Sequence, residues 1–259
     1  MAYAVGVCDT IFVGYSNTAN SDRFGNKAKM KNYYIIVDTE TTITDKVVDF
    51  GAVVCDTKGN IVAQCAVIVS GVFGVDDLFY DTKSSGIWSR NSIDRRMANY
   101  NNMIDNGSRI VASVNSINRW LDKVCAKYNP TLTAYNLAFD TAKCQNTGID
   151  LNMFNNRFCL WQAAIGNICN TKAYRNFIIQ NHLFNNVTQH GNMTFSTTAE
   201  SVTGYLANNM TDEPHTALED IIGYELPTLV YILKRKGWKN KIIPYNWKAH
   251  QVKDYFVAK

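Results

Sequence analysis

Four carboxylates and one imidazole lie in three short stretches that are far apart in this chain. These side chains belong to Asp38, Glu40, Asp140, Asp220 and His215. Carboxylate oxygens are hard ligands that select Mg²⁺ or Mn²⁺ over zinc, and bound Mg²⁺ commonly keeps waters and substrate phosphate oxygens in its shell. A histidine with an ordinary pKa of about 6.5 can accept a proton from such a water near neutral pH. The residue types therefore suit metal-assisted phosphodiester hydrolysis.

The first stretch follows five apolar or aromatic residues, from Tyr33 to Val37, that predict a buried strand. Side chains alternate between the two faces of a strand, so Asp38 and Glu40 are expected to point the same way and Thr39 the opposite way. An Asp-x-Glu pair taken alone more often marks a solvated turn. Its position at the end of a buried strand favours two carboxylates that share a cation.

The second stretch places Asp140 soon after a short strand that is predicted from Thr131 to Tyr135. Asn136 stands four residues before the carboxylate. An aspartate at such a place is also common as a helix N-cap, or as a first-turn acid that complements the helix dipole. By itself this motif leaves both interpretations open.

The third stretch has His215 and Asp220 five residues apart, directly after Pro214, which disfavours helix at the residue before it. Five residues of α-helix rotate the side-chain direction by about 500°, so the two would not share one helical face. We therefore expect Asp220 inside a helix and His215 in the loop at its start. An exposed histidine at a helix start is the ordinary alternative. Glu219, beside Asp220, is most simply interpreted as facing solvent.

The elements that must position these residues are strands first and helices later. Strands are predicted at 33–37, 47–55 and 61–69, where short turns favour an antiparallel meander. Apolar residues at helical spacing follow between Ser92 and Tyr128, beginning with Ile110, and Asn129-Pro130 ends this run. Residues 140–210 predict helices with one short strand near Phe158, and a capped helix start at 197–200. A final long helix is predicted from His215, with an interruption at Pro227.

This order predicts an α/β fold, a mixed sheet with three antiparallel strands flanked by helices. The chain has 259 residues, of which 46% are hydrophobic, so it can bury a substantial core. We expect an N-terminal extension at 1–32, a main domain at 33–236, and a basic and aromatic C-terminal tail at 237–259.

Composition narrows the function classes. The 26 Lys and Arg against 22 Asp and Glu give a net charge of +4, so a nucleic-acid site must come from local clustering of charge. Seven cysteines without a Cys-x-x-Cys pair argue against a disulfide framework and a thiolate zinc site, and favour reduced thiols in the cytoplasm. No apolar run reaches the roughly 18–20 residues that span a bilayer, so no membrane partner is expected.

Together the three stretches resemble the DEDDh family of 3′→5′ exonucleases, which includes proofreading subunits, ribonuclease T, oligoribonuclease and phage-encoded enzymes. The motifs run in the family's order: Asp-x-Glu-Thr-Thr, Asn-x-x-Phe-Asp and His-x-Ala-x-x-Asp. Thr216 stands where a tyrosine-type relative would have Tyr. The resemblance covers roughly Tyr33 to Lys236 and implies a ribonuclease H-like fold.

The resemblance also implies the roles of the site residues. Two Mg²⁺ (or Mn²⁺) ions about 3.5–4 Å apart would activate the attacking water and stabilise the leaving 3′ oxygen. The ligands would be Asp38, Glu40, Asp140 and Asp220, with His215 as the general base. The implied reaction releases nucleoside 5′-monophosphates from 3′ ends of DNA, with single-stranded ends favoured, in the cytosol of a bacterium or a phage-infected host.

The residues that contact the substrate and the type of nucleic acid stay open. Thr41, Thr42 and Asn136 could contact the terminal nucleotide, although turn formation is an equally ordinary role for the threonines. The motifs do not separate a DNA exonuclease from an exoribonuclease that trims RNA ends. A non-catalytic nucleic-acid-binding or polymerase-associated protein is a further alternative.

The tail and one loop carry aromatic residues that also suit nucleic acid. Lysines after residue 233 are interleaved with Trp238, Tyr245 and Trp247, and cations beside aromatic faces suit single strands. Docking of these aromatic residues on the core, with the lysines solvated, is the interpretation we favour. Trp88, in a polar loop, could stack on a base, although loop aromatic residues more often pack locally.

Overall fold

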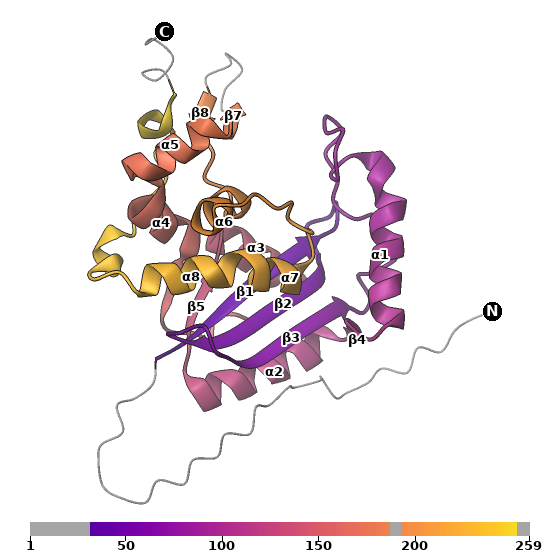
Figure 1. Cartoon of the computed structure of the whole chain (residues 1–259). Coiled ribbons are helices and arrows are strands. Elements are labelled where there is room, and N and C mark those ends of the chain that lie inside the picture. The colour runs from indigo at the N-terminus through magenta and orange to yellow at the C-terminus, as the bar shows by residue number, and fades with distance from the viewer. Residues whose placement is uncertain (1–31, 187–192, 253–259) are drawn as a thin grey trace, which may run out of the picture.

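The structure is a computed structural model that describes residues 32–186 and 193–252 (Figure 1). Nearly all of the expected N-terminal extension, and the end of the tail from residue 253, lie outside the described residues.

A six-stranded sheet in the order β4-β3-β2-β1-β5-β6 forms the centre of the molecule. Its strands are β1 (Tyr33–Thr41), β2 (Val47–Asp56), β3 (Ile61–Val69), β4 (Ile110–Ala112), β5 (Thr131–Ala134) and β6 (Arg157–Cys159). The first three form the expected antiparallel meander, whereas β4, β5 and β6 pair in parallel with their neighbours. The prediction of an α/β fold with a mixed sheet is therefore confirmed. The predicted number of antiparallel strands, three, is wrong for the sheet as a whole. Strands β1, β3, β4, β5 and β6 all run in one direction, and only β2 runs in the opposite direction.

Strand β4 lies where the apolar spacing predicted helix. The segment is divided into α1 (Ile93–Asp105), β4 and α2 (Val114–Tyr128). Ile110 pairs with Val67 of β3, and Ser113 then caps α2 by accepting a hydrogen bond from the Ser116 backbone N–H. A strand of three residues is too short to show the alternation that distinguishes strand from helix.

The region from residue 140 to 210 is mainly helical, as expected. It holds α3 (Leu137–Thr147), α4 (Leu160–Ala164), η2 (Ile165–Cys169), α5 (Lys172–Gln180) and α6 (Ala199–Ala207). The Thr198 hydroxyl caps α6, as its sequence predicts. A short hairpin of β7 (Phe184–Asn186) and β8 (Met193–Phe195) was not predicted, because its strands are only three residues long.

Helices cover both faces of the sheet. Alternate residues of β1 pack in two different cores, with Tyr34 and Ile36 in one and Ile35 and Val37 in the other. The first core is closed by α4–α6 and by the helical segment from α7 (Ala217–Asp220) to α8 (Leu226–Leu233); the second is closed by α2 and α3. The alternation continues beyond residue 37, so it turns residues 38 and 40 toward the side of α7.

The last helical segment lies across the sheet in one line (Figure 1). Between α7 and α8 it contains a π-helical turn, η3 (Ile221–Glu225), in which the Leu226 N–H donates to the Ile221 carbonyl. The expected interruption is therefore a π turn just before Pro227. Gly51 of β2 permits close packing here, because a Cβ at this position would lie 2.6 Å from the Ala217 carbonyl carbon.

The described part of the tail, up to residue 252, docks on the core as expected. Trp238 of η4 (Trp238–Lys241) is buried, and Ile242, Ile243 and Tyr245 pack against the first core before η5 (Trp247–His250). Lys239 and Lys241 are exposed. Across the described residues, the cysteines Cys55, Cys65, Cys125, Cys144, Cys159 and Cys169 are all free thiols, and no helix is both long and apolar enough to cross a membrane.

Candidate metal centre

The candidate residues gather at one edge of the sheet. Strands β1 and β5 run parallel, so their carboxyl ends meet at this edge. Asp38 and Glu40 belong to the end of β1, and Asp140 lies in the first turn of α3, which follows β5. The loop before α7 brings His215 over the same edge, and Asp220 ends α7. Three segments distant in the chain therefore meet, as their order predicts.

Glu40, His215 and Asp220 form the closest group, with one ligand atom from each within 4.8 Å of the others. With Asp38 they line a cavity of about 270 Å³. His215 has a φ of 55°, which is a left-handed conformation that few non-glycine residues adopt. Such a backbone is held only where the surroundings determine it, which is common at functional sites. The expected placement, His215 in the loop and Asp220 in the helix, is confirmed.

Asp140 does not belong to that close group. Its Oδ1 accepts a hydrogen bond of 2.9 Å from the Thr39 hydroxyl. Asp38 and Asp140 both line a second cavity, of about 610 Å³. The Thr39 hydroxyl therefore orients the Asp140 carboxylate. Hydrogen bonds of this kind commonly fix ligating carboxylates.

Burial and mutual repulsion define the electrostatics of the centre. Burial raises the pKa of Asp38 well above its usual value, and the charges of the neighbouring carboxylates raise it further. Burial likewise raises the pKa of Asp140 to about 7, and burial with the charge of Glu213 raises that of Asp220 to about 8. The Asp220 Oδ1 is buried without a hydrogen-bond partner. Clustered hard oxygen donors, one of them orphaned, fit divalent cations of the Mg²⁺ type.

His215 is kept close to neutrality. Burial lowers its pKa, and the charge of Arg96 lowers it further. The Trp88 ring packs edge-on against the imidazole, with ring centroids 4.7 Å apart, and Arg96 lies 5.1 Å from the Trp88 ring centre. Trp88 thus packs locally and also lines the first cavity. A neutral imidazole can accept a proton at neutral pH.

The three residues that are expected to contact the substrate lie in three different surroundings. Thr41 lines the first cavity and Asn136 lines the second. Thr42 is fully buried, and its hydroxyl accepts a hydrogen bond from the Lys46 N–H in the turn after β1. The structure therefore gives Thr42 a turn-forming role. Two further carboxylates, Glu213 and Glu225, line the second cavity and were not singled out from the sequence.

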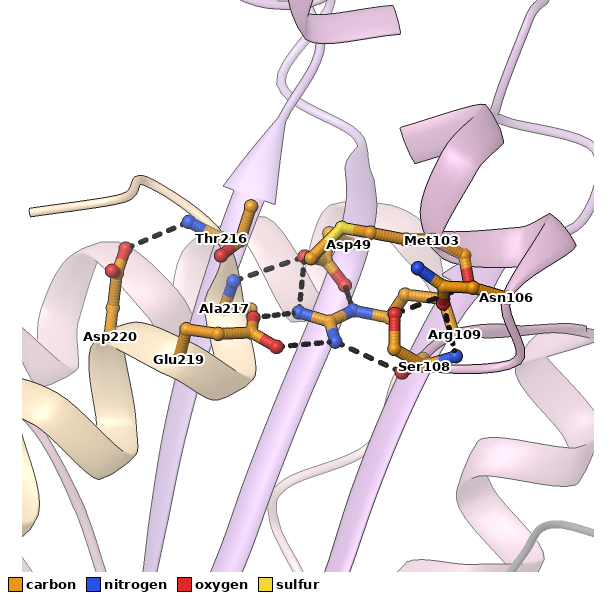
Figure 2. Close-up of polar contacts among 9 residues, drawn as sticks. All are labelled: Asp49, Met103, Asn106, Ser108, Arg109, Thr216, Ala217, Glu219 and Asp220. Atoms are coloured by element: carbon orange, nitrogen blue, oxygen red, sulfur yellow. Dashed lines mark hydrogen bonds and ion pairs between the residues drawn. The ribbon is translucent and has the colours of Figure 1, made fainter. Parts of the chain in front are cut away.

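A buried ion network anchors α7 to the sheet (Figure 2). The Arg109 Nε donates to Asp49 Oδ1 at 2.9 Å, and its Nη1 donates to Glu219 Oε1 at 3.0 Å. Asp49 Oδ2 also accepts a 3.0 Å hydrogen bond from the Ala217 N–H. The interpretation of Glu219 as facing solvent holds only in part, because this side chain is 38% exposed but is also paired with Arg109. No local sequence pattern indicates this pair, because Arg109 and Glu219 are 110 residues apart in the chain.

Comparisons with protein-family models, with curated proteins and with solved structures find no significant match to this chain.

The raised pKa values of Asp140 and Asp220 predict a pH dependence of stability. Both carboxylates have a pKa of about 3.9 when unfolded, so between about pH 4 and pH 8 the folded protein binds more protons than the unfolded chain. Stability in EDTA should fall as the pH rises from 5 to 8, by at least about 4 °C in Tm. Adding Mg²⁺ at pH 8 should recover the loss, because a cation that binds only the folded state stabilises it. A Tm in EDTA that stays constant or rises over this range would contradict the prediction.

Proposed function

We propose that this chain is a metal-dependent 3′→5′ exonuclease that hydrolyses the terminal phosphodiester of DNA, preferably at single-stranded 3′ ends. The observation that carries the proposal is the convergence of Glu40, His215 and Asp220 within 4.8 Å beside Asp38. These residues come from β1 and from the start of the last core helical segment, about 175 residues later in the chain. Such a convergence has no evident structural purpose, because like charges gathered under burial are costly unless they are paired or bind a metal.

In this proposal Asp38, Glu40, Asp140 and Asp220 hold the cations, and Thr39 keeps the Asp140 carboxylate in place. The chemistry that two divalent cations supply when bound is a lower pKa for the attacking water and stabilisation of the leaving 3′ oxygen. His215 accepts the proton of that water at its imidazole. Its lowered pKa keeps the ring unprotonated and ready for this step at neutral pH.

The surroundings of the first cavity support a nucleic-acid substrate. Phe79 and Phe139 line this cavity and are 42% and 43% exposed as whole residues. Exposed aromatic faces beside a cleft suit the stacking of unpaired bases. Lys143 also lines the cavity. Its ammonium lies 4.8 Å from the Phe139 ring centre and is paired with Asp45, so a substrate phosphate would replace this carboxylate as its partner. These features favour a single-stranded end.

We also propose that the fold is ribonuclease H-like. A meander of β1–β3 that continues into parallel β5 and β6, with helices on both faces, supports this assignment. The carboxylates at the end of the central strand β1 support it as well.

The test is a time course on 3′- and 5′-labelled oligonucleotides of DNA and RNA, with Mg²⁺ or with EDTA. We expect stepwise shortening from the 3′ end that yields nucleoside 5′-monophosphates and stops in EDTA. Faster shortening of RNA would replace DNA by RNA as the substrate. No degradation of either polymer in Mg²⁺ or Mn²⁺ would refute the proposal and leave a binding protein.

The exposed lysines of the docked tail give a second prediction. Lys239 and Lys241 lie in η4, and Trp238, the first residue of η4, is buried against the core. Changing both lysines to Gln should weaken oligonucleotide binding, and the slope of log affinity against log salt should shrink by about 1–2. Fluorescence anisotropy at several salt concentrations measures both effects, with the exposed Lys123→Gln on α2 as the control. An unchanged salt slope would rule out this role for the tail.

A further inference from the structure

Glu225 is a carboxylate of the centre that the motifs do not contain. It ends the π-helical turn η3, five residues after Asp220. In a regular α-helix these two side chains would point about 140° apart. A turn closed by a hydrogen bond between residues five apart returns the fifth residue close to the starting face, and such turns are frequent at functional sites. The π turn thus directs Glu225 to the sheet edge that Asp220 also faces.

The two oxygens of Glu225 have different surroundings. Oε1 accepts a 3.1 Å hydrogen bond from the Tyr135 N–H, at the junction between β5 and α3. Oε2 is buried and has no hydrogen-bond partner, and the residue as a whole is 3% exposed. In residues 32–186 and 193–252 no ion pair engages this carboxylate. One oxygen is therefore fixed while the other is left without a partner beside the second cavity.

The charged groups that act on Glu225 are all carboxylates: Asp140, Glu213 and Asp220. Among its charged neighbours, Asp140 has the largest effect on Glu225, and Glu225 has the largest effect on Asp38. All three line the second cavity. A buried carboxylate among like charges is costly unless a cation compensates it. The hydrogen bond from Tyr135 alone does not provide that compensation.

We propose that Glu225 is a fifth carboxylate ligand of the metal centre, and that its Oε2 binds the cation held between Asp38 and Asp140. This inference rests on the proposed function, because it assumes that these two aspartates hold a cation. That cation then has three protein carboxylates as ligands. Glu40 and Asp220 bind the other cation, which lies near His215. Tyr135 then acts as the support that orients the ligand through its backbone N–H.

The test is calorimetric titration of Mn²⁺ into the metal-depleted full chain, without substrate. The variant is Glu225→Gln, which keeps an oxygen for the Tyr135 N–H but loses the carboxylate. Wild type should bind two ions, and the variant should bind one of them at least about tenfold more weakly. Asp122→Asn, on the exposed face of α2 and outside both cavities, is the control and should bind as wild type does.

Thermal unfolding in EDTA separates a ligand from a structural acid. If Glu225 is a ligand, Glu225→Gln should raise Tm in EDTA at alkaline pH, where the clustered carboxylates are ionised, because it removes a buried charge from among like charges. A lower Tm with unchanged Mn²⁺ affinity would overturn the proposal and leave Glu225 as a helix-packing residue. Equal Mn²⁺ binding by wild type and variant overturns this inference alone. Failure of the wild type to bind Mn²⁺ overturns the proposed function, and this inference with it.

Discussion

Replacing either Asp38 or Asp220 with Asn is expected to slow removal of the 3′-terminal nucleotide in Mg²⁺ by at least about 10³-fold. Each change removes a charged ligand while keeping the shape of the side chain. Cations contribute several kcal/mol of charge stabilisation to such reactions, and each 1.36 kcal/mol corresponds to a factor of ten in rate. Asp38 should have the larger effect, because it lines both cavities and therefore faces both groups of carboxylates.

The variants should still bind an oligonucleotide and should be at least as stable as wild type in EDTA, because each loses one repelling charge. Single-turnover rates, anisotropy and thermal unfolding together distinguish lost chemistry from lost structure. Asp122→Asn, on the exposed face of α2, is the matched control and should keep full activity. Full activity in either site variant would exclude that residue from the metal centre.

Arg109→Met is expected to lower the free energy of unfolding by about 3–5 kcal/mol, because it leaves buried carboxylate charge without its partner. Arg109 is 1% exposed and Asp49 is fully buried. Asp49→Asn should have an effect of similar size, since it leaves the guanidinium partly unpaired. Glu219→Gln should cost less, because the Glu219 side chain is 38% exposed and its charge can be hydrated.

Urea unfolding measures these differences, with the exposed Arg95→Met on α1 as the control. The network also holds the first turn of α7 through the Asp49 contact with the Ala217 N–H, so Arg109→Met should lose activity at temperatures where it remains folded. A loss of stability below about 1 kcal/mol would mean that the network contributes little to folding.

The position of the first carboxylate pair could be predicted because strand geometry is rigid. Five apolar residues define β1, and the two-residue alternation of a strand places Asp38 and Glu40 on one face. The alternation also places Thr39 on the other face. Its hydrogen bond to Asp140 could not be predicted, since it depends on how α3 begins after β5.

The placement of His215 and Asp220 could be predicted from a simpler argument. Five residues cannot return to the same face of an α-helix, so one of the pair had to lie outside it. Glu225 is also five residues from Asp220, but a regular α-helix between them would direct the two side chains to different faces. The π turn between residues 221 and 225 depends on tertiary packing, and no local sequence signal marks it.

Three short strands and one ion pair could not be predicted from the sequence. The strands are too short, and the two residues of the ion pair are too far apart in the chain. The strands β4, β7 and β8 each have three residues, too few to establish a period. The partner of Glu219 lies 110 residues away, so local pattern left it facing solvent. The pairing of Glu219 with Arg109 is a contact between distant segments, which a single sequence does not specify.

The most direct test of the central claim is crystallography of the wild-type chain soaked with Mn²⁺, using anomalous differences to locate the ions. The carboxylate cluster is expected to show two peaks within about 4 Å of each other, with Asp38 between them. One peak should lie beside Glu40 and Asp220, and the other beside Asp140. Absence of any peak at these carboxylates, in crystals that bind Mn²⁺ elsewhere, would contradict the claim that this edge of the sheet is a metal centre.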